Sequence, residues 1–211
     1  MGALVGGLIA CAPAAEAASI CESVASNLVT NCGFESTAGS APAGWTTGGT
    51  NGVAFALATY QNTGARALDL AFDAPGSAFA SQALGGAGTY AVSFWLTFYT
   101  GGIISSERAP TVAVTFGDQV LSVPNIPLGL QDPVYAQYQF ASVATATPAV
   151  LRFETSGTTR NQFYEFFVDD VVVTLLAAAP DPQANIPEPS SFPLVMAGVA
   201  GLALAARRRR A

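Results

Sequence analysis

Hydrophobic and polar residues alternate in short segments along most of the chain, which is typical of strands that bury one face. The clearest segment covers residues 90–99, where the sequence reads YAVSFWLTFY. Its two faces carry different residues: Val92, Phe94, Leu96 and Phe98 on one, and Ser93, Trp95, Thr97 and Tyr99 on the other. We expect the first set to form a hydrophobic core, because burying each large apolar side chain stabilises a fold by roughly 1.5–3 kcal/mol.

Eight segments are predicted to be strands by this alternation: 53–60, 67–72, 78–84, 90–99, 111–116, 135–143, 149–154 and 166–175. Gly, Pro, Ser and Asn lie between them, as in the Ala-Pro-Gly-Ser stretch at 74–77. No helical periodicity of useful length occurs before residue 190. This spacing predicts an all-β fold, an antiparallel β-sandwich of the jelly-roll type, over residues 18–176.

Composition narrows the functions that such a domain could have. The 211 residues include eight basic and 14 acidic residues, with no histidine, and the formal net charge is −6. An acidic chain repels phosphate backbones, so we do not expect nucleic-acid binding. The absence of histidine removes the usual general acid–base group and the commonest zinc ligand, and it excludes a Ser-His-Asp triad.

The first 17 residues predict a signal peptide. An apolar run, Leu4–Ala12, precedes an Ala-Glu-Ala sequence that fits the small-x-small pattern of a cleavage site. Cleavage there leaves Ala18 as the first residue of the exported chain. An N-terminal strand or a buried helix is the alternative.

Two cysteines follow this segment directly, Cys21 and Cys32. In an oxidising compartment such a pair predicts a disulfide, which would fasten the N-terminal segment to the first strand. Two free buried thiols are the alternative. A metal site is not expected, because two thiolates without histidine are too few ligands.

Three features stand in a fixed order in residues 187–211. They are the tripeptide Pro187, Glu188 and Pro189, the uncharged and mostly apolar segment Phe192–Ala206, and the basic tail Arg207, Arg208, Arg209 and Arg210. As a helix the apolar segment would span roughly 22 Å, a thin transmembrane helix with its arginines in the cytoplasm. Residues 177–186 are then a linker.

This order of features resembles the PEP-CTERM sorting signal of Gram-negative bacteria. The resemblance implies that an exosortase, a membrane transpeptidase-like protease, recognises the tail and cuts near the tripeptide. The helix would then tether the chain to the inner membrane only transiently. The resemblance also implies a link with secreted exopolysaccharide, whereas the alternative is a plain single-pass anchor.

Two further stretches, NLVTNCGFES at 27–36 and FFVDDVVVT at 166–174, resemble the first and last strands of galactose-binding-like jelly rolls. That superfamily includes carbohydrate-binding modules attached to glycoside hydrolases. Residues 81–96 and 135–143 also fit its pattern, so the likeness covers most of residues 27–175. The resemblance implies that Trp45 is a core residue.

The same resemblance implies a structural calcium ion. Its ligands would be Glu35, a backbone carbonyl near Asn31 or Gly33, and Asp169, with Asp170 as a substitute. Calcium prefers oxygen ligands of this kind. The alternative is that one of the two aspartates faces water at a sheet edge.

We find no motif for catalysis. Asp169 and Asp170 are neighbours on a predicted strand, so their side chains should point to opposite faces and cannot flank one glycosidic bond. No nucleophile elbow, phosphate-binding loop or dinucleotide fingerprint is present. The chain is therefore predicted not to be an enzyme.

A binding surface is predicted on the strand face opposite the core. Aromatic rings beside hydroxyl and amide groups suit the stacking and hydrogen bonding of a sugar. The residues with these groups are Trp95, Tyr99, Gln137 and Gln139. The alternative is that a loop or the second sheet covers Trp95.

The sequence thus predicts an exported, exosortase-sorted protein of the cell surface or extracellular matrix. It is predicted to be non-catalytic and associated with polysaccharide. The alternatives are a small secreted hydrolase that uses carboxylates, and an adhesin that keeps its membrane anchor.

Overall fold

The computed structural model describes residues 18–99, 111–124, 126, 128–129, 134–158 and 163–179. The predicted signal peptide and the segment 187–211 lie outside these residues. The chain divides into two units, 1–179 and 180–211, and every described residue belongs to the first. No helix in the described part is long and apolar enough to cross a membrane.

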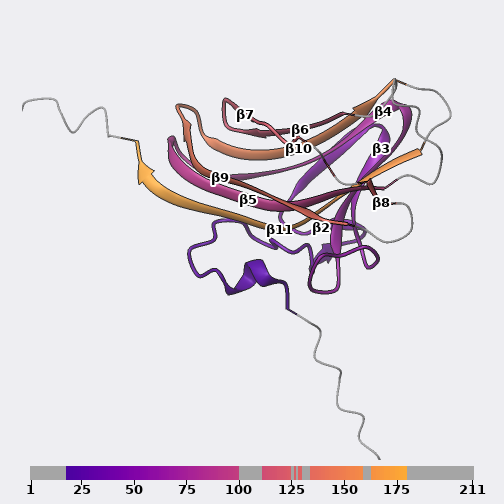
Figure 1. The fold of residues 1–211 in the computed structure, drawn as a ribbon, viewed down its shortest axis with the longest axis horizontal. Helices are drawn as coiled ribbons and strands as arrows, with labels where there is room; N and C mark the ends of the chain where they lie inside the picture. The colour runs from indigo at the N-terminus through magenta and orange to yellow at the C-terminus, as the bar shows by residue number, and fades with distance from the viewer. Residues whose placement is uncertain are drawn as a thin grey trace, which may run out of the picture. The chain divides into compact units, whose positions relative to one another are not determined.

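The described residues form a β-sandwich, as predicted (Figure 1). Its elements are η1 (Ile20–Ser23), β1 (Thr37–Ala38), β2 (Ala41–Pro42), β3 (Thr46–Leu57), β4 (Ala67–Gly85), β5 (Gly88–Tyr99), β6 (Thr111–Phe116), β7 (Gln119–Leu121), β8 (Leu128–Gly129), β9 (Ala136–Thr145), β10 (Ala149–Gly157) and β11 (Phe163–Ala178). The strand order is β7-β6-β10-β4-β11-β5-β8, with β3 also on β4 and β9 also on β5. All these pairs are antiparallel except β5 with β8.

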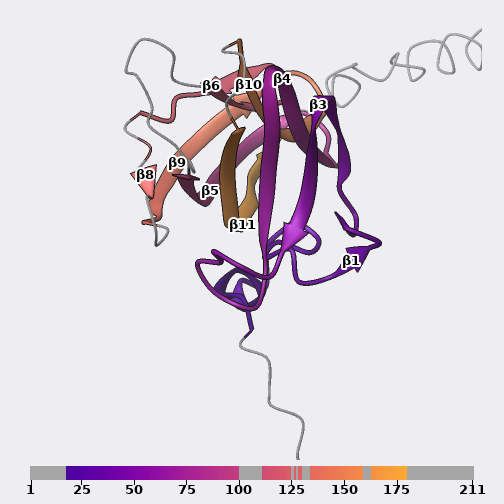
Figure 2. The same ribbon diagram turned by 90° about the vertical axis from the view of Figure 1, so that its right-hand side faces the viewer.

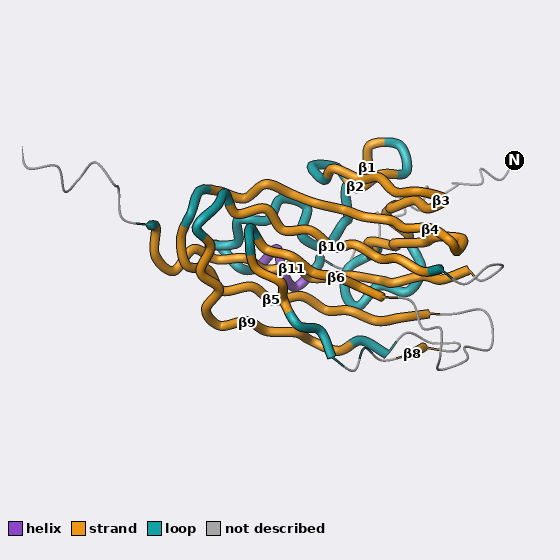
Figure 3. The backbone as a smooth tube through the Cα atoms, turned by 90° about the horizontal axis from the view of Figure 1, so that it is seen from above, coloured by secondary structure: helices purple, strands orange, loops and turns teal. Residues whose placement is uncertain are grey.

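Strand β4 belongs to both layers of the sandwich (Figures 2 and 3). Its first part, 68–73, pairs with β11, and its second part, 76–85, pairs with β10. Strand β3 follows β4 through the same bend. We call the layer with β9, β5 and β11 the β5 sheet, and the layer with β7, β6 and β10 the β10 sheet.

This long strand corrects the prediction of two separate strands, 67–72 and 78–84. The Ala-Pro-Gly-Ser stretch between them does not end the strand but lies where it crosses between layers. The partner strand has a register shift between Thr50 and Gly52 at this bend, and an irregular position of this kind tolerates a proline that lacks an N–H. A Cβ atom on Gly49 would lie 2.2 Å from the carbonyl oxygen of Ser77, so the two strands approach too closely for any other residue.

The core lies between the two sheets. Val92, Phe94, Leu96 and Phe98 are all buried, which confirms the prediction from the alternation in β5. Trp45 is also buried, as predicted, and its ring packs between those of Phe34 and Phe153, with centroid distances of 5.1 and 6.2 Å. The outward-facing residues of the β5 sheet therefore lie over a buried core.

Candidate functional site

A hollow opens on the outer face of the β5 sheet. Ser93 of β5 lies directly opposite Gln139 of β9 in the strand register. Small side chains around this pair leave space between the strands, and the hollow has a volume of about 190 Å³. Its outward-facing lining residues include Ala91, Ser93, Gln139, Ala141, Val172 and Thr174.

Trp95 lies two residues from this hollow along β5. It pairs with Gln137 of β9 on one side and with Asp169 of β11 on the other. The indole is half-buried, so part of it faces solvent, whereas Gln137 and Gln139 are exposed. The Nε2 group of Gln139 donates to Oε1 of Gln137 at 2.8 Å. The structure thus brings three of the four predicted binding residues together beside the hollow.

Tyr99, the fourth predicted residue, lies under a loop. Its ring stacks on that of Tyr60 with centroids 5.2 Å apart, and Tyr60 also contacts Phe167 at 5.2 Å. The hydroxyl of Tyr135 donates to the carbonyl oxygen of Tyr60. The connection between β3 and β4 therefore covers this end of the face, where Thr97 is fully buried.

Beneath the same end lies an acidic pair that the sequence analysis did not identify. Asp69 of β4 is 0 % exposed, and neither of its carboxyl oxygens receives a donor from any described N–H or O–H group. Glu165 of β11 lies within hydrogen-bonding reach of it. Burial, then the nearby Glu165 charge, raises the pKa of Asp69 from 3.8 to about 8. Asp69 can therefore keep a proton near neutral pH and donate it to Glu165.

Asp169 and Asp170 both point toward the loop at Asn62 and Thr63, so the prediction that they face opposite sides was wrong. The register of β11 shifts between Asp169 and Val172, and Asp170 adopts a positive φ of 49°. This bulge turns both side chains to one side. Oδ2 of Asp169 accepts the backbone N–H groups of Asn62 and Thr63 at 2.8 and 3.1 Å. Burial, then the charge of Asp170, raises the pKa of Asp169 to about 8.

Glu35 borders the other end of the same loop. Its Oε1 accepts the backbone N–H groups of Ala65 and Arg66 at 2.9 and 3.4 Å. The predicted calcium ligands thus surround one loop, but hydrogen-bond donors point at their oxygens. Within the described ranges, no three Asp, Glu, His or Cys residues are placed to share a metal ion. This donor set does not fit a cation, and calcium stays a prediction from the resemblance.

The predicted disulfide between Cys21 and Cys32 is present. It links η1 to the segment that precedes β1. The side chain of Asn27, which lies between the two cysteines, joins this region to β11. Its Nδ2 donates to the carbonyl oxygen of Val171 at 3.0 Å, and its Oδ1 accepts the N–H of Val173 at 2.9 Å. The N-terminal segment is thereby fastened to β11.

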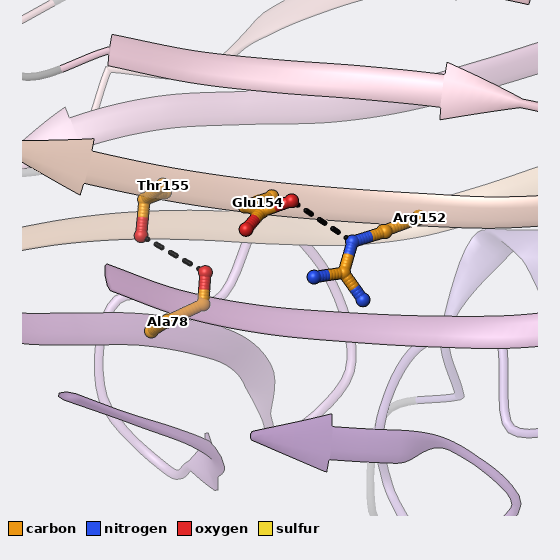
Figure 4. A network of polar contacts seen from close by, with 4 residues as sticks. All are labelled: Ala78, Arg152, Glu154 and Thr155. Atoms are coloured by element: carbon orange, nitrogen blue, oxygen red, sulfur yellow. Dashed lines mark hydrogen bonds and ion pairs between the residues drawn. The ribbon is translucent and has the colours of Figure 1, made fainter. Parts of the chain in front are cut away.

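The outer face of the β10 sheet is different in character (Figure 4). Nε of Arg152 lies 3.0 Å from Oε2 of Glu154, and its guanidinium lies 3.6 Å from the ring centroid of Phe79. Thr155, in contrast, is 0 % exposed and lies on the inward side of β10, where its hydroxyl donates to the carbonyl oxygen of Ala78 at 3.3 Å. None of the predicted binding residues lies on this face.

The described residues have a β-sandwich fold that is also seen in a solved carbohydrate-binding module. The chain is similar to TmCBM61, solved in complex with beta-1,4-galactotriose, at 19 % identity and a TM-score of 0.50 over 71 % of this chain and 98 % of that one. It is also similar to the CBM22-1 xylan-binding domain of Xyn10C from Paenibacillus barcinonensis, at 15 % identity and a TM-score of 0.46 over 72 % and 96 %. A third similar structure is the enzymatically active domain of tailspike protein 4 from bacteriophage CBA120, at 15 % identity and a TM-score of 0.47 over 72 % and 22 %.

The tail is identified more specifically than the body. Residues 185–210 match the PEP-CTERM protein-sorting motif. The chain therefore carries a sorting signal of this type, and its described body has the fold of a carbohydrate-binding module. A comparison with curated proteins gave no match.

Proposed function

We propose that this protein is exported, processed by an exosortase and released to the cell surface or matrix, where its jelly roll binds carbohydrate without catalysis. The sorting motif at 185–210 supports the first part. The hollow beside Trp95 is the observation that supports the second, because it lies on an open sheet face next to a half-buried indole.

The chemistry of this face suits a sugar. The exposed part of Trp95 offers an apolar surface for stacking, and Ser93, Gln137 and Gln139 offer hydroxyl and amide groups for hydrogen bonds. The hollow, at about 190 Å³, is smaller than the roughly 300–1,000 Å³ pockets that enclose drug-sized ligands. An extended glycan lying across the strands fits such a surface better than an enclosed small molecule does.

Charge favours a neutral glycan. Of the described residues only Arg66 and Arg152 are basic. Arg152 lies on the opposite sheet beside Glu154, and Arg66 donates to the carbonyl oxygen of Ala56 at 3.3 Å. No described cation faces the hollow, so a polysaccharide rich in carboxylate or sulfate groups would lack a counter-charge there.

The acidic residues support binding rather than hydrolysis. Glycosidases hold two carboxyl groups roughly 5–5.5 Å or 6.5–9.5 Å apart, with the sugar bond between them. Asp69 and Glu165 are within hydrogen-bonding reach of each other. Asp69 is 0 % exposed, so a polysaccharide bound at the surface does not reach this pair.

The test is a binding screen with the exported chain. Affinity gel electrophoresis would compare neutral galactan, xylan and β-glucan with anionic alginate and polygalacturonate. We expect retardation by at least one neutral glycan, and Trp95→Ala should weaken it about fivefold or more, since stacking contributes about 1 kcal/mol or more. Thr115→Ala, on the outer face of the β10 sheet, is the matched control.

Three results would count against the proposal. They are the absence of binding to every glycan, unchanged binding by Trp95→Ala, and release of reducing ends from a bound polysaccharide. The last result would favour the secreted hydrolase instead.

A further inference from the structure

The side chain of Ser19 lies among the residues that were predicted to hold calcium. It is 2 % exposed, and its hydroxyl donates to Oδ1 of Asp170. A Cβ atom on Gly33 would lie 2.2 Å from Oγ of Ser19. A Cβ atom on Gly64 would lie 3.4 Å from the backbone nitrogen of Ser19 and 1.8 Å from Oε1 of Glu35. Ser19 is therefore bordered by both glycines, and Asp170 and Glu35 flank it.

Hydrogen-bond donors saturate the central carboxylate. Besides Ser19, Oδ1 of Asp170 faces the hydroxyl of Thr63 at 2.7 Å and the N–H of Cys21 at 3.4 Å. Oδ2 faces the side-chain amide of Asn62 at 2.9 Å and the same Thr63 hydroxyl at 2.8 Å. An ionised carboxylate has about four lone-pair sites, so little capacity is left for a metal ion. Calcium takes six to eight oxygen ligands, and N–H groups cannot serve as ligands.

A covalent tether holds Ser19 in this position. The disulfide joins Cys21, two residues after Ser19, to Cys32, the residue before Gly33. The N–H of the intervening Ile20 donates to Oγ1 of Thr63 at 3.1 Å, so the segment also contacts the loop directly. A side chain tethered in this way is always present at a high effective concentration, whereas a free ion must be drawn from the medium.

We infer that Ser19 and its disulfide-tethered segment replace a structural calcium ion in this protein. The segment joins the region before β1, the loop at 62–66 and the bulge of β11, which are the parts that a shared ion would connect. The inference concerns the stability of the fold and does not depend on the proposed glycan binding.

The first test uses the chain purified after export, without substitution. Its Tm would be measured after treatment with EDTA and again with calcium at millimolar concentration, the upper part of the range in which extracellular modules bind it. At about 1 mM calcium, a resident ion with a Kd of about 0.1 mM is at about a tenfold excess and would raise the Tm by roughly 3–6 °C. We expect a change of no more than about 1 °C. A rise in the resident-ion range, or one calcium bound per chain by calorimetry, would overturn the inference.

The second test removes the hydroxyl. Ser19→Ala should lower the Tm by several degrees, equally with and without calcium, because Asp170 loses a buried donor. Ser23→Ala is the matched control, since its exposed hydroxyl only donates to the carbonyl oxygen of Ile20. An unchanged Tm for Ser19→Ala would contradict the inference. If that variant does not fold, the calcium response of the unsubstituted chain still decides the matter.

A third variant separates the two roles of Glu35. Glu35→Gln keeps an oxygen that can accept the N–H groups of Ala65 and Arg66, so we expect a Tm close to that of the unsubstituted chain. A metal ligand would not be replaced so easily. Loss of a calcium-dependent rise in Tm on this substitution would show that Glu35 binds the ion.

Discussion

Phe94 of β5 and Phe153 of β10 meet edge to face across the sandwich, with ring centroids 5.0 Å apart and planes at 86°. Both side chains are 0 % exposed. This contact joins the sheet that carries the candidate binding face to the opposite sheet. Phe153 also contacts Trp45, so one ring links the core of the sandwich to the segment before β3.

Phe153→Ala should therefore destabilise the body by about 3–5 kcal/mol, the usual cost of deleting a buried aromatic ring. Urea unfolding followed by tryptophan fluorescence would measure the change. Phe153→Leu should cost less because it leaves a smaller cavity. Equal costs for the two variants would show that the ring fills no specific space in the core.

Alternation in the sequence was sufficient to predict the core side of this fold. Strand β6 occupies the predicted residues 111–116, and β5 extends the predicted segment by only two residues. A strand with one buried face carries its own signal, because every second residue must be apolar. The sorting tail was predictable for a different reason, because its motif is contained in one short stretch, residues 185–210.

Features that depend on contacts between distant segments were not predictable in this way. The bend of β4 depends on its neighbour β3, and the bulge at Asp170 depends on β5, so local sequence gave no sign of either. Ser19 contacts Asp170, 151 residues away, and nothing near Ser19 indicates that partner. The cover over Tyr99 was missed because Tyr60 was assigned to the end of a strand.

The bend gives a second prediction. Gly49→Ala should destabilise the fold by several kcal/mol or prevent folding, since the added carbon would lie 2.2 Å from a backbone oxygen that cannot move freely. Gly86→Ala is the control, because a Cβ atom there would meet no atom within 4 Å. Thermal unfolding of the two variants side by side would show the difference. Similar Tm values would mean that the strands can separate at the bend.

The pair of Asp69 and Glu165 makes stability depend on pH. The pKa of Asp69 rises from 3.8 to about 8 on folding, so between these values the folded state holds a proton that the unfolded state has lost. The stabilising contribution is therefore complete below about pH 4 and declines as the pH rises to 8. Asp69→Asn should flatten this decline and be the more stable protein at pH 8.

Urea unfolding at pH 5, 6.5 and 8 would test this prediction. Asp73→Asn is a suitable control. Asp73 lies on the same strand, four residues after Asp69, and its side chain is exposed. If the free energy of unfolding declines with pH at the same slope in Asp69→Asn and in the unsubstituted chain, the pH dependence comes from other groups. If Asp69→Asn keeps a smaller decline in stability with rising pH, Asp169 would account for it, because the pKa of Asp169 is also about 8.

The disulfide should contribute about 2–4 kcal/mol, because Cys21 and Cys32 close a short loop with a sequence separation of 11. The double variant Cys21→Ser, Cys32→Ser should unfold at a correspondingly lower urea concentration. Reducing agent should lower the stability of the unsubstituted chain to a similar level and leave the variant unaffected. A response of the variant to reducing agent would point to a different reactive group.

The sorting motif gives the last prediction. If an exosortase cuts near Pro187–Pro189, the exported protein lacks the arginine tail, whereas a permanent anchor keeps it. Intact-mass measurement of the released protein should therefore give a mass that excludes Arg207–Arg210.

Replacing Pro187, Glu188 and Pro189 by alanines should block the cut and keep the chain in the membrane fraction, because the apolar segment then stays attached. Thr174→Ser, in the body, is a control that should be processed normally. If the unsubstituted protein stays in the membrane fraction with a mass that includes Arg207–Arg210, that result would contradict processing and favour a tail that serves as a lasting anchor.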